Sequence, residues 1–126
     1  MALRLLIADD NELLRIGVRA LIELKRDWEI CGEASDGDEA IAKALALAPD
    51  VVVLDLSMPL MNGFRAAEEI RRASPSTRIV FLSVHDVPAT ASAAGADAFV
   101  SKASPAEVLI STIERVSKRP TALPGS

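Results

Sequence analysis

Short apolar runs alternate with longer amphipathic stretches along this chain of 126 residues. The apolar runs are too short for helices and are rich in Val, Ile and Leu, which predicts β-strands. These predicted strands cover residues 3–8, 28–34, 51–54, 78–82 and 98–101. The third run reads VVVL, and such an unbroken aliphatic run is typical of a strand that is buried on both faces of a parallel sheet.

The stretches between the predicted strands have the apolar spacing of helices. Helices are predicted over residues 11–25, 38–48, 64–73, 87–94 and 104–117. The last of these begins with Ser-Pro-Ala-Glu, which predicts a capping box with Ser104 as the cap and proline in the first turn. The stretch 87–94 is short and consists mainly of small residues, so we expect a short and weakly formed helix there.

Strands that alternate with helices predict an α/β domain with a parallel sheet. The common five-stranded, doubly wound arrangement is the flavodoxin-like one, with strand order 2-1-3-4-5. Ligands bind in this arrangement at the carboxyl ends of strands 1 and 3, where the chain reverses direction. We expect one domain over residues 1–118 and a linker-like tail over 119–126, because the tail contains two prolines and a glycine.

Polar residues follow four of the five predicted strands. Asp9 and Asp10 follow the first strand, and Asp55 follows the third. Three neighbouring carboxylates repel one another unless a cation neutralises them, and oxygen ligands of this kind suit Mg²⁺. Ser83 and Lys102 end the fourth and fifth strands. A hydroxyl donor and an ammonium group beside a metal could stabilise a phosphoryl group, so this end of the sheet is a candidate phosphoryl site.

Each of these residues also has a plainer interpretation. Asp9 or Asp10 could cap the helix that follows, and a lysine such as Lys102 is commonly a solvated surface residue. The candidate site therefore depends on the whole set of residues occurring together, each at the end of its own strand.

Four stretches carry a resemblance to a known family: LLIADDNELLRIGVRALI, VVVLDLSMPLMNGF, IVFLSVHD and GADAFVSKASPAEVL. Together they resemble the receiver domain of two-component response regulators over nearly the whole chain. The segments DLSMP and LSVHD are similar to those of the NarL/FixJ subgroup. Members of that subgroup usually carry a LuxR-type helix-turn-helix output domain, so the resemblance implies transcription regulation through a domain outside this chain.

The resemblance implies a role for each matching residue. Asp55 would accept a phosphoryl group from a histidine kinase. Asp10, Asp55 and the backbone carbonyl of Ser57 would bind Mg²⁺, and Asp9 would act through a water molecule. Lys102 would pair with the phosphoryl group.

Three further residues enter through the same resemblance. Ser83 and Phe99 would form the switch pair, in which the hydroxyl moves toward the phosphate and the ring moves inward. Phe99 could equally be an ordinary core aromatic. Ser57 and His85 stand where receivers tune the lifetime of the phosphate, although His85 could also be an exposed loop residue.

The sequence departs from the family pattern at two points. Many receivers have a proline after the lysine, with a cis peptide bond between them, whereas Ala103 follows Lys102 here. A cis bond before a residue other than proline costs about 3 kcal/mol, so the sequence leaves open whether this bond is cis or trans. The segment between Ser83 and Gly95 is also about one helical turn shorter than in the family pattern.

Composition narrows the remaining possibilities. A net charge of −4 without a basic stripe argues against direct DNA binding by this chain. The single cysteine, Cys31, excludes an intramolecular disulfide and a cysteine metal cluster, and we expect it to be a small buried residue. No stretch predicts a signal peptide or a membrane span, so we expect a cytoplasmic protein without a membrane partner. A homodimer would use the helices predicted over 11–25 and 104–117.

Three alternatives stay open at this stage. A Mg²⁺ phosphohydrolase of the haloacid-dehalogenase type would need a second aspartate where Ser57 stands. A stand-alone receiver would act through protein contacts, and a degenerate receiver would not be phosphorylated. The intact set of site residues favours a phosphoacceptor that is not an enzyme, apart from self-phosphotransfer and slow loss of its phosphate.

Overall fold

The computed structural model describes residues 2–56, 63–83 and 96–118. Its parallel sheet has the order β2-β1-β3-β4-β5, as the sequence predicts. The strands are β1 (Leu3–Ala8), β2 (Trp28–Ala34), β3 (Val51–Asp55), β4 (Arg78–Ser83) and β5 (Ala98–Ser101).

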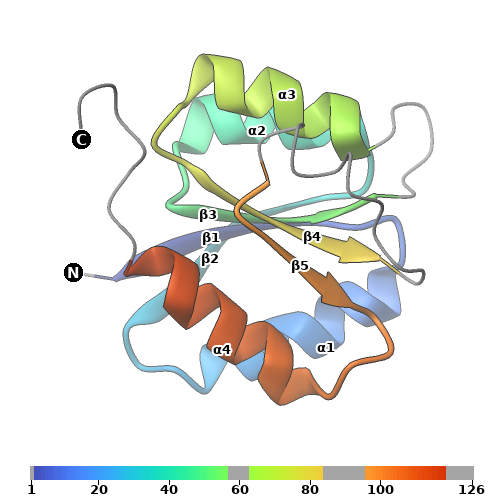
Figure 1. The fold of residues 1–126 in the computed structure, drawn as a ribbon, viewed down its shortest axis with the longest axis vertical. Helices are drawn as coiled ribbons and strands as arrows, with labels where there is room; N and C mark the ends of the chain where they lie inside the picture. Colours follow the sequence, from blue (N-terminus) through green and yellow to red (C-terminus); the bar gives the residue numbers. More distant parts are fainter. Residues whose placement is uncertain (1, 57–62, 84–95, 119–126) are drawn as a thin grey trace.

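Helices cover both faces of this sheet. The described helices are α1 (Glu12–Glu23), α2 (Gly37–Leu47), α3 (Gly63–Ala73) and α4 (Ala106–Ser117). As Figure 1 shows, α2 and α3 lie on one face, and α1 and α4 lie on the other. The helix predicted over 87–94 lies outside the described residues. In the described part of the chain, no helix has the length and apolar character required to cross a bilayer.

The strand β3 explains why both faces of the sheet are apolar. All of its residues are buried, and successive side chains of a strand point to opposite faces. Val52 and Leu54 belong to the apolar cluster under α2 and α3. Val51 and Val53 belong to the cluster under α1 and α4. The core therefore consists of two apolar layers that hold the strand ends in fixed positions.

The beginnings of two helices differ from one another. Asn11 caps α1, since its side chain accepts a hydrogen bond from the backbone N–H of Leu14 at 3.2 Å. The capping box predicted at Ser104 is wrong. The backbone at Pro105 is extended, with a ψ of 149°, and α4 begins only at the next residue without a side-chain cap. Ser104 instead belongs to a turn, in which its N–H donates to the Ser101 carbonyl oxygen at 3.0 Å.

Cys31 is less buried than we expected. It lies on the edge strand β2 and is only partly buried, as a free thiol. Its partial burial raises the pKa of the thiol, although the positive charge of Arg4 opposes the shift. The thiol is therefore mostly protonated at neutral pH.

Candidate functional site

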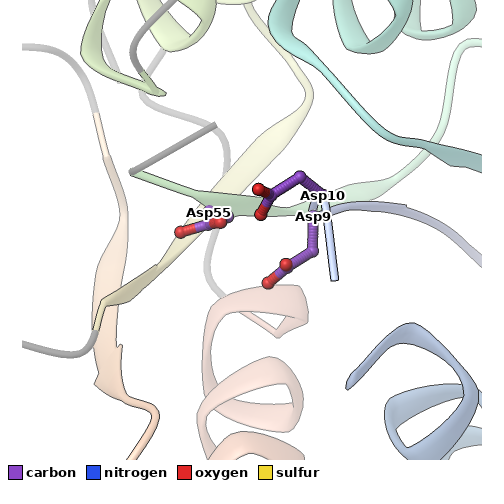
Figure 2. Close-up of side chains that lie close together, drawn as sticks. All are labelled: Asp9, Asp10 and Asp55. Atoms are coloured by element: carbon purple, nitrogen blue, oxygen red, sulfur yellow. The ribbon is translucent and has the colours of Figure 1, made fainter. Parts of the chain in front are cut away.

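Three carboxylates meet at the carboxyl end of the sheet. The strands β1 and β3 are neighbours, with Ala8 opposite Leu54, so the residues that follow or end them lie side by side. Asp9, Asp10 and Asp55 each offer one carboxylate oxygen to a group whose members all lie within 4.8 Å of one another. Figure 2 shows the side chains at the ends of these two strands. The sequence-based prediction that distant aspartates meet here is confirmed.

The carboxylates differ in exposure. Asp9 and Asp55 are buried, whereas Asp10 is exposed. Asp9 Oδ1 accepts a hydrogen bond from the backbone N–H of Asn11 at 2.8 Å, which closes a turn just before α1. Because Asn11 provides the helix cap, neither Asp9 nor Asp10 serves as that cap. Helix capping therefore does not explain why Asp9 is buried.

Lys102 brings a positive charge to the same place. Its Nζ lies 2.9 Å from Asp9 Oδ2 and 3.4 Å from Asp55 Oδ2. Its backbone N–H donates to the Ser83 carbonyl oxygen at 2.7 Å, which fixes the end of β5 against β4. Burial by itself would lower the pKa of Lys102, but the hydrogen bond with Asp9 and the charges of Asp55 and Asp9 outweigh it and raise the pKa. The ammonium group is therefore charged at neutral pH.

The donor set fits a divalent cation. Among the described residues, three carboxylates lie together and the Lys102 ammonium group pairs with two of them, Asp9 and Asp55, so negative charge is in excess there. Asp9 Oδ2 is buried and lies 2.9 Å from the Lys102 ammonium nitrogen. An ionised carboxylate oxygen has more than one lone pair, so it can also accept from a water molecule or bind an ion. Carboxylate oxygens are the ligands that Mg²⁺ prefers, and the exposed Asp10 leaves room for the waters that this ion keeps.

Ser83 and Phe99 lie where the sequence predicts. Ser83 is buried at the end of β4, beside the strand that carries Asp55. Phe99 is partly buried on β5, and its ring centroid lies 5.7 Å from that of Phe81. Phe81 also makes an edge-on contact with Phe64, at 5.4 Å. Phe99 thus packs at the margin of the core, which accords with both interpretations of this residue.

Two predicted site residues, Ser57 and His85, lie outside the described residues. The peptide bond between Lys102 and Ala103 is trans, as the described residues contain no cis bond. The Ala103 N–H donates to Ser101 Oγ at 3.1 Å, so a local turn orients the chain just after Lys102.

Arg15 also contacts the site, although no motif in the sequence singles it out. Its guanidinium donates to the backbone carbonyl oxygen of Asp9 and, through Nε, to Glu33 Oε1 at 3.2 Å. In the sequence it is one of several charged residues of an amphipathic helix. Its position within a few residues of the acidic pair was the one available signal.

Comparisons with known proteins give a consistent family. The model of the family described as response regulator receiver domain matches residues 5–114. The nitrate/nitrite response regulator protein NarL of Escherichia coli K12 is 39% identical over 117 residues, which are 90% of this chain and 54% of that protein. The response regulator protein VraR of Staphylococcus aureus is 32% identical over 121 residues, 94% of this chain and 58% of that protein. The chain thus spans little more than half the length of these relatives.

Solved structures agree in fold. A LuxR-family two-component response regulator from Aurantimonas superposes with a TM-score of 0.88 at 32% identity, covering 93% of this chain and 86% of that one. The signal receiver domain of the putative response regulator NarL from Mycobacterium tuberculosis also gives 0.88, at 33% identity, covering 94% and 98%. These similarities confirm the resemblance to the subgroup with LuxR-type output.

Proposed function

Because this chain belongs to the response regulator receiver domains, we propose that Asp55 accepts a phosphoryl group from a histidine kinase. The observation that carries the proposal is the cluster of Asp9, Asp10 and Asp55, with the Lys102 ammonium group paired to Asp9 and Asp55. In the transfer, a carboxylate oxygen of Asp55 attacks phosphorus, the bond from phosphorus to the kinase histidine breaks, and the imidazole leaves with that electron pair. The product is an acyl phosphate on Asp55.

Mg²⁺ is the proposed cofactor. Asp10, Asp55 and the backbone carbonyl of Ser57 would hold it, with Asp9 acting through a water molecule. When bound, the ion would neutralise charge on the phosphoryl oxygens. The clustering of three carboxylates, two of them buried, supports this proposal.

Lys102 and Ser83 would stabilise the phosphorylated state. Lys102 already lies 3.4 Å from Asp55, so its ammonium group can pair with a phosphoryl oxygen after a small movement. Ser83 would donate its hydroxyl to another phosphoryl oxygen, and Phe99 would move inward with it. Ser57 and His85 would tune how long the phosphate survives.

The output we propose is control of transcription through a DNA-binding domain. The support comes from relatives of which the matched part of this chain spans little more than half the length, and from similarity to the structure of a DNA-binding response regulator of the LuxR family from Staphylococcus aureus, at 31% identity. A stand-alone receiver that acts through protein contacts is the second candidate. Leu13 and Ile16 of α1 and Val108 of α4 are exposed apolar residues, so self-association through these two helices stays a prediction.

Acetyl phosphate tests the phosphoacceptor role without the kinase. With Mg²⁺, the wild-type chain should gain a single phosphoryl group by intact mass, and Asp55→Asn should gain none. Asp27→Asn is the matched control, because it makes the same chemical change at an exposed position at the far end of β1 and β2. Continuous release of phosphate would indicate a phosphohydrolase, and a wild-type level of phosphorylation in Asp55→Asn would contradict the assignment.

A further inference from the structure

We propose that Arg15 is a positioning residue, which holds the backbone of Asp9 so that the acidic pair is set to receive a divalent cation. The inference rests on the proposed function, since it concerns the same Mg²⁺ site. Arg15 would not touch the ion or the phosphoryl group. It would act through the Asp9 carbonyl, to which its guanidinium donates.

The hydrogen bonds between β1 and β2 end at Asp9, the residue that Arg15 contacts. The Asp9 N–H donates to the Ala34 carbonyl oxygen at 3.0 Å, and Ala34 is the last residue of β2. The next N–H, that of Ser35, is taken by Glu39 Oε1 at 2.6 Å. The ladder between the two strands therefore ends here, and Arg15 supplies a donor for the Asp9 carbonyl from α1.

Three contacts on one residue define the conformation of Asp9. Its N–H bonds to Ala34, its carbonyl oxygen accepts from Arg15, and its Oδ1 accepts from the Asn11 N–H. The remaining oxygen, Oδ2, is buried and lies 2.9 Å from the Lys102 ammonium nitrogen. Holding the backbone on the α1 side thus leaves this oxygen directed toward the carboxylate cluster and Lys102.

The surroundings of Arg15 favour a geometric role over an electrostatic one. A cation near the beginning of a helix is unfavourable, because that end of the helix dipole is positive. A cation near a Mg²⁺ site is unfavourable as well, because it repels the ion. Glu33 offsets the charge of Arg15 at 3.2 Å, and it also pairs with Arg19. Arg15 contributes a planar guanidinium group that donates one hydrogen bond to the Asp9 carbonyl oxygen and another to the Glu33 carboxylate.

These two roles predict opposite signs for one measurement. If Arg15 acted only as a charge, its removal would strengthen Mg²⁺ binding. If it positions Asp9, its removal should weaken Mg²⁺ binding about tenfold, the size seen when a group that orients a metal ligand is lost. Arg19→Ala is the matched control, since it removes a positive charge from the same Glu33 and has no contact with Asp9 in the described residues.

The experiment is calorimetric titration of Mg²⁺ into the wild type, Arg15→Ala, Arg15→Lys and Arg19→Ala, with the thermal midpoint of each protein recorded without metal. We expect about tenfold weaker binding in Arg15→Ala, a smaller loss in Arg15→Lys, and an affinity within about twofold of wild type in Arg19→Ala. Arg15→Lys keeps the charge and the stem, so it reports on the role even where Arg15→Ala does not fold.

Two results would overturn the inference. The first is a Mg²⁺ affinity in the Arg15 variants that equals or exceeds that of the wild type. If their thermal midpoints also fall, Arg15 stabilises the fold without positioning the metal site. Failure of the wild-type protein to bind Mg²⁺ at all would overturn the proposed function and the inference with it. That result is seen before any variant is compared, so the two failures are distinguishable.

Discussion

At the amino end of the sheet, the buried Thr77 hydroxyl donates to the Pro49 carbonyl oxygen at 3.0 Å, and the buried Arg78 donates through Nε to the Val116 carbonyl oxygen at 3.1 Å. At the carboxyl end, the buried Asp9 and Asp55 share a single ammonium group, that of Lys102, among the described residues. Both ends bury polar side chains. At the amino end, the polar side chains bond to backbone carbonyl oxygens that need donors. At the carboxyl end, the buried side chains are carboxylates, which repel one another.

This difference separates a structural end from a functional end. A buried polar group that is bonded to a backbone group stabilises the fold, whereas buried like charges repel one another and need another explanation. Asp9 and Asp55 are such charges. Local conflicts of this kind are expected where a protein binds a ligand, so substitutions at the two ends should differ in their effects on the free energy of unfolding.

The largest change in stability is expected at the amino end. Arg78→Met should lower the free energy of unfolding by about 2–3 kcal/mol, because the Val116 carbonyl loses a charged donor in a buried place. Arg72→Met is the control, since that side chain is 74% exposed and pairs with Glu69 only at 3.6 Å; it should change stability little. Urea denaturation measures both. Equal losses of unfolding free energy in the two variants would show that the buried Arg78 hydrogen bond does not stabilise this end of the sheet.

The next effect concerns metal binding at the carboxyl end. Asp10→Asn should weaken Mg²⁺ binding at least about tenfold, which is ~1.4 kcal/mol, because an exposed carboxylate of the cluster is lost. Stability without metal should not fall. Asp27→Asn again provides the control of equal charge. Calorimetric titration checks the prediction, and an unchanged affinity in Asp10→Asn would mean that the site is misplaced.

The smallest effect has the opposite sign from that at Arg78. Asp55→Asn should leave the metal-free protein as stable as wild type or up to about 1 kcal/mol more stable, because repulsion between buried carboxylates is relieved. Lys102 keeps its contact with Asp9 at 2.9 Å. Urea denaturation without Mg²⁺ measures the change. A loss as large as that in Arg78→Met would show that the carboxylates at this end stabilise the fold.

Much of the fold follows from the sequence alone. The aliphatic run of β3 could be recognised because a strand buried on both faces needs apolar residues at every position. The strand order and the meeting of Asp9, Asp10 and Asp55 followed from topology. Ser104 was misread because the capping pattern describes side chains, whereas the extended backbone at Pro105 decides where α4 begins.

Other features depended on the tertiary structure. No local pattern shows that the Arg15 guanidinium turns toward the Asp9 carbonyl, or that Asn11 rather than an aspartate caps α1. Periodicity gives the face of a helix on which a residue lies, but not the partner that the face meets. The sequence therefore determined which residue types stand at the strand ends. Only the packed structure decided which are buried and bonded, because burial and hydrogen bonding depend on atoms brought together from distant parts of the chain.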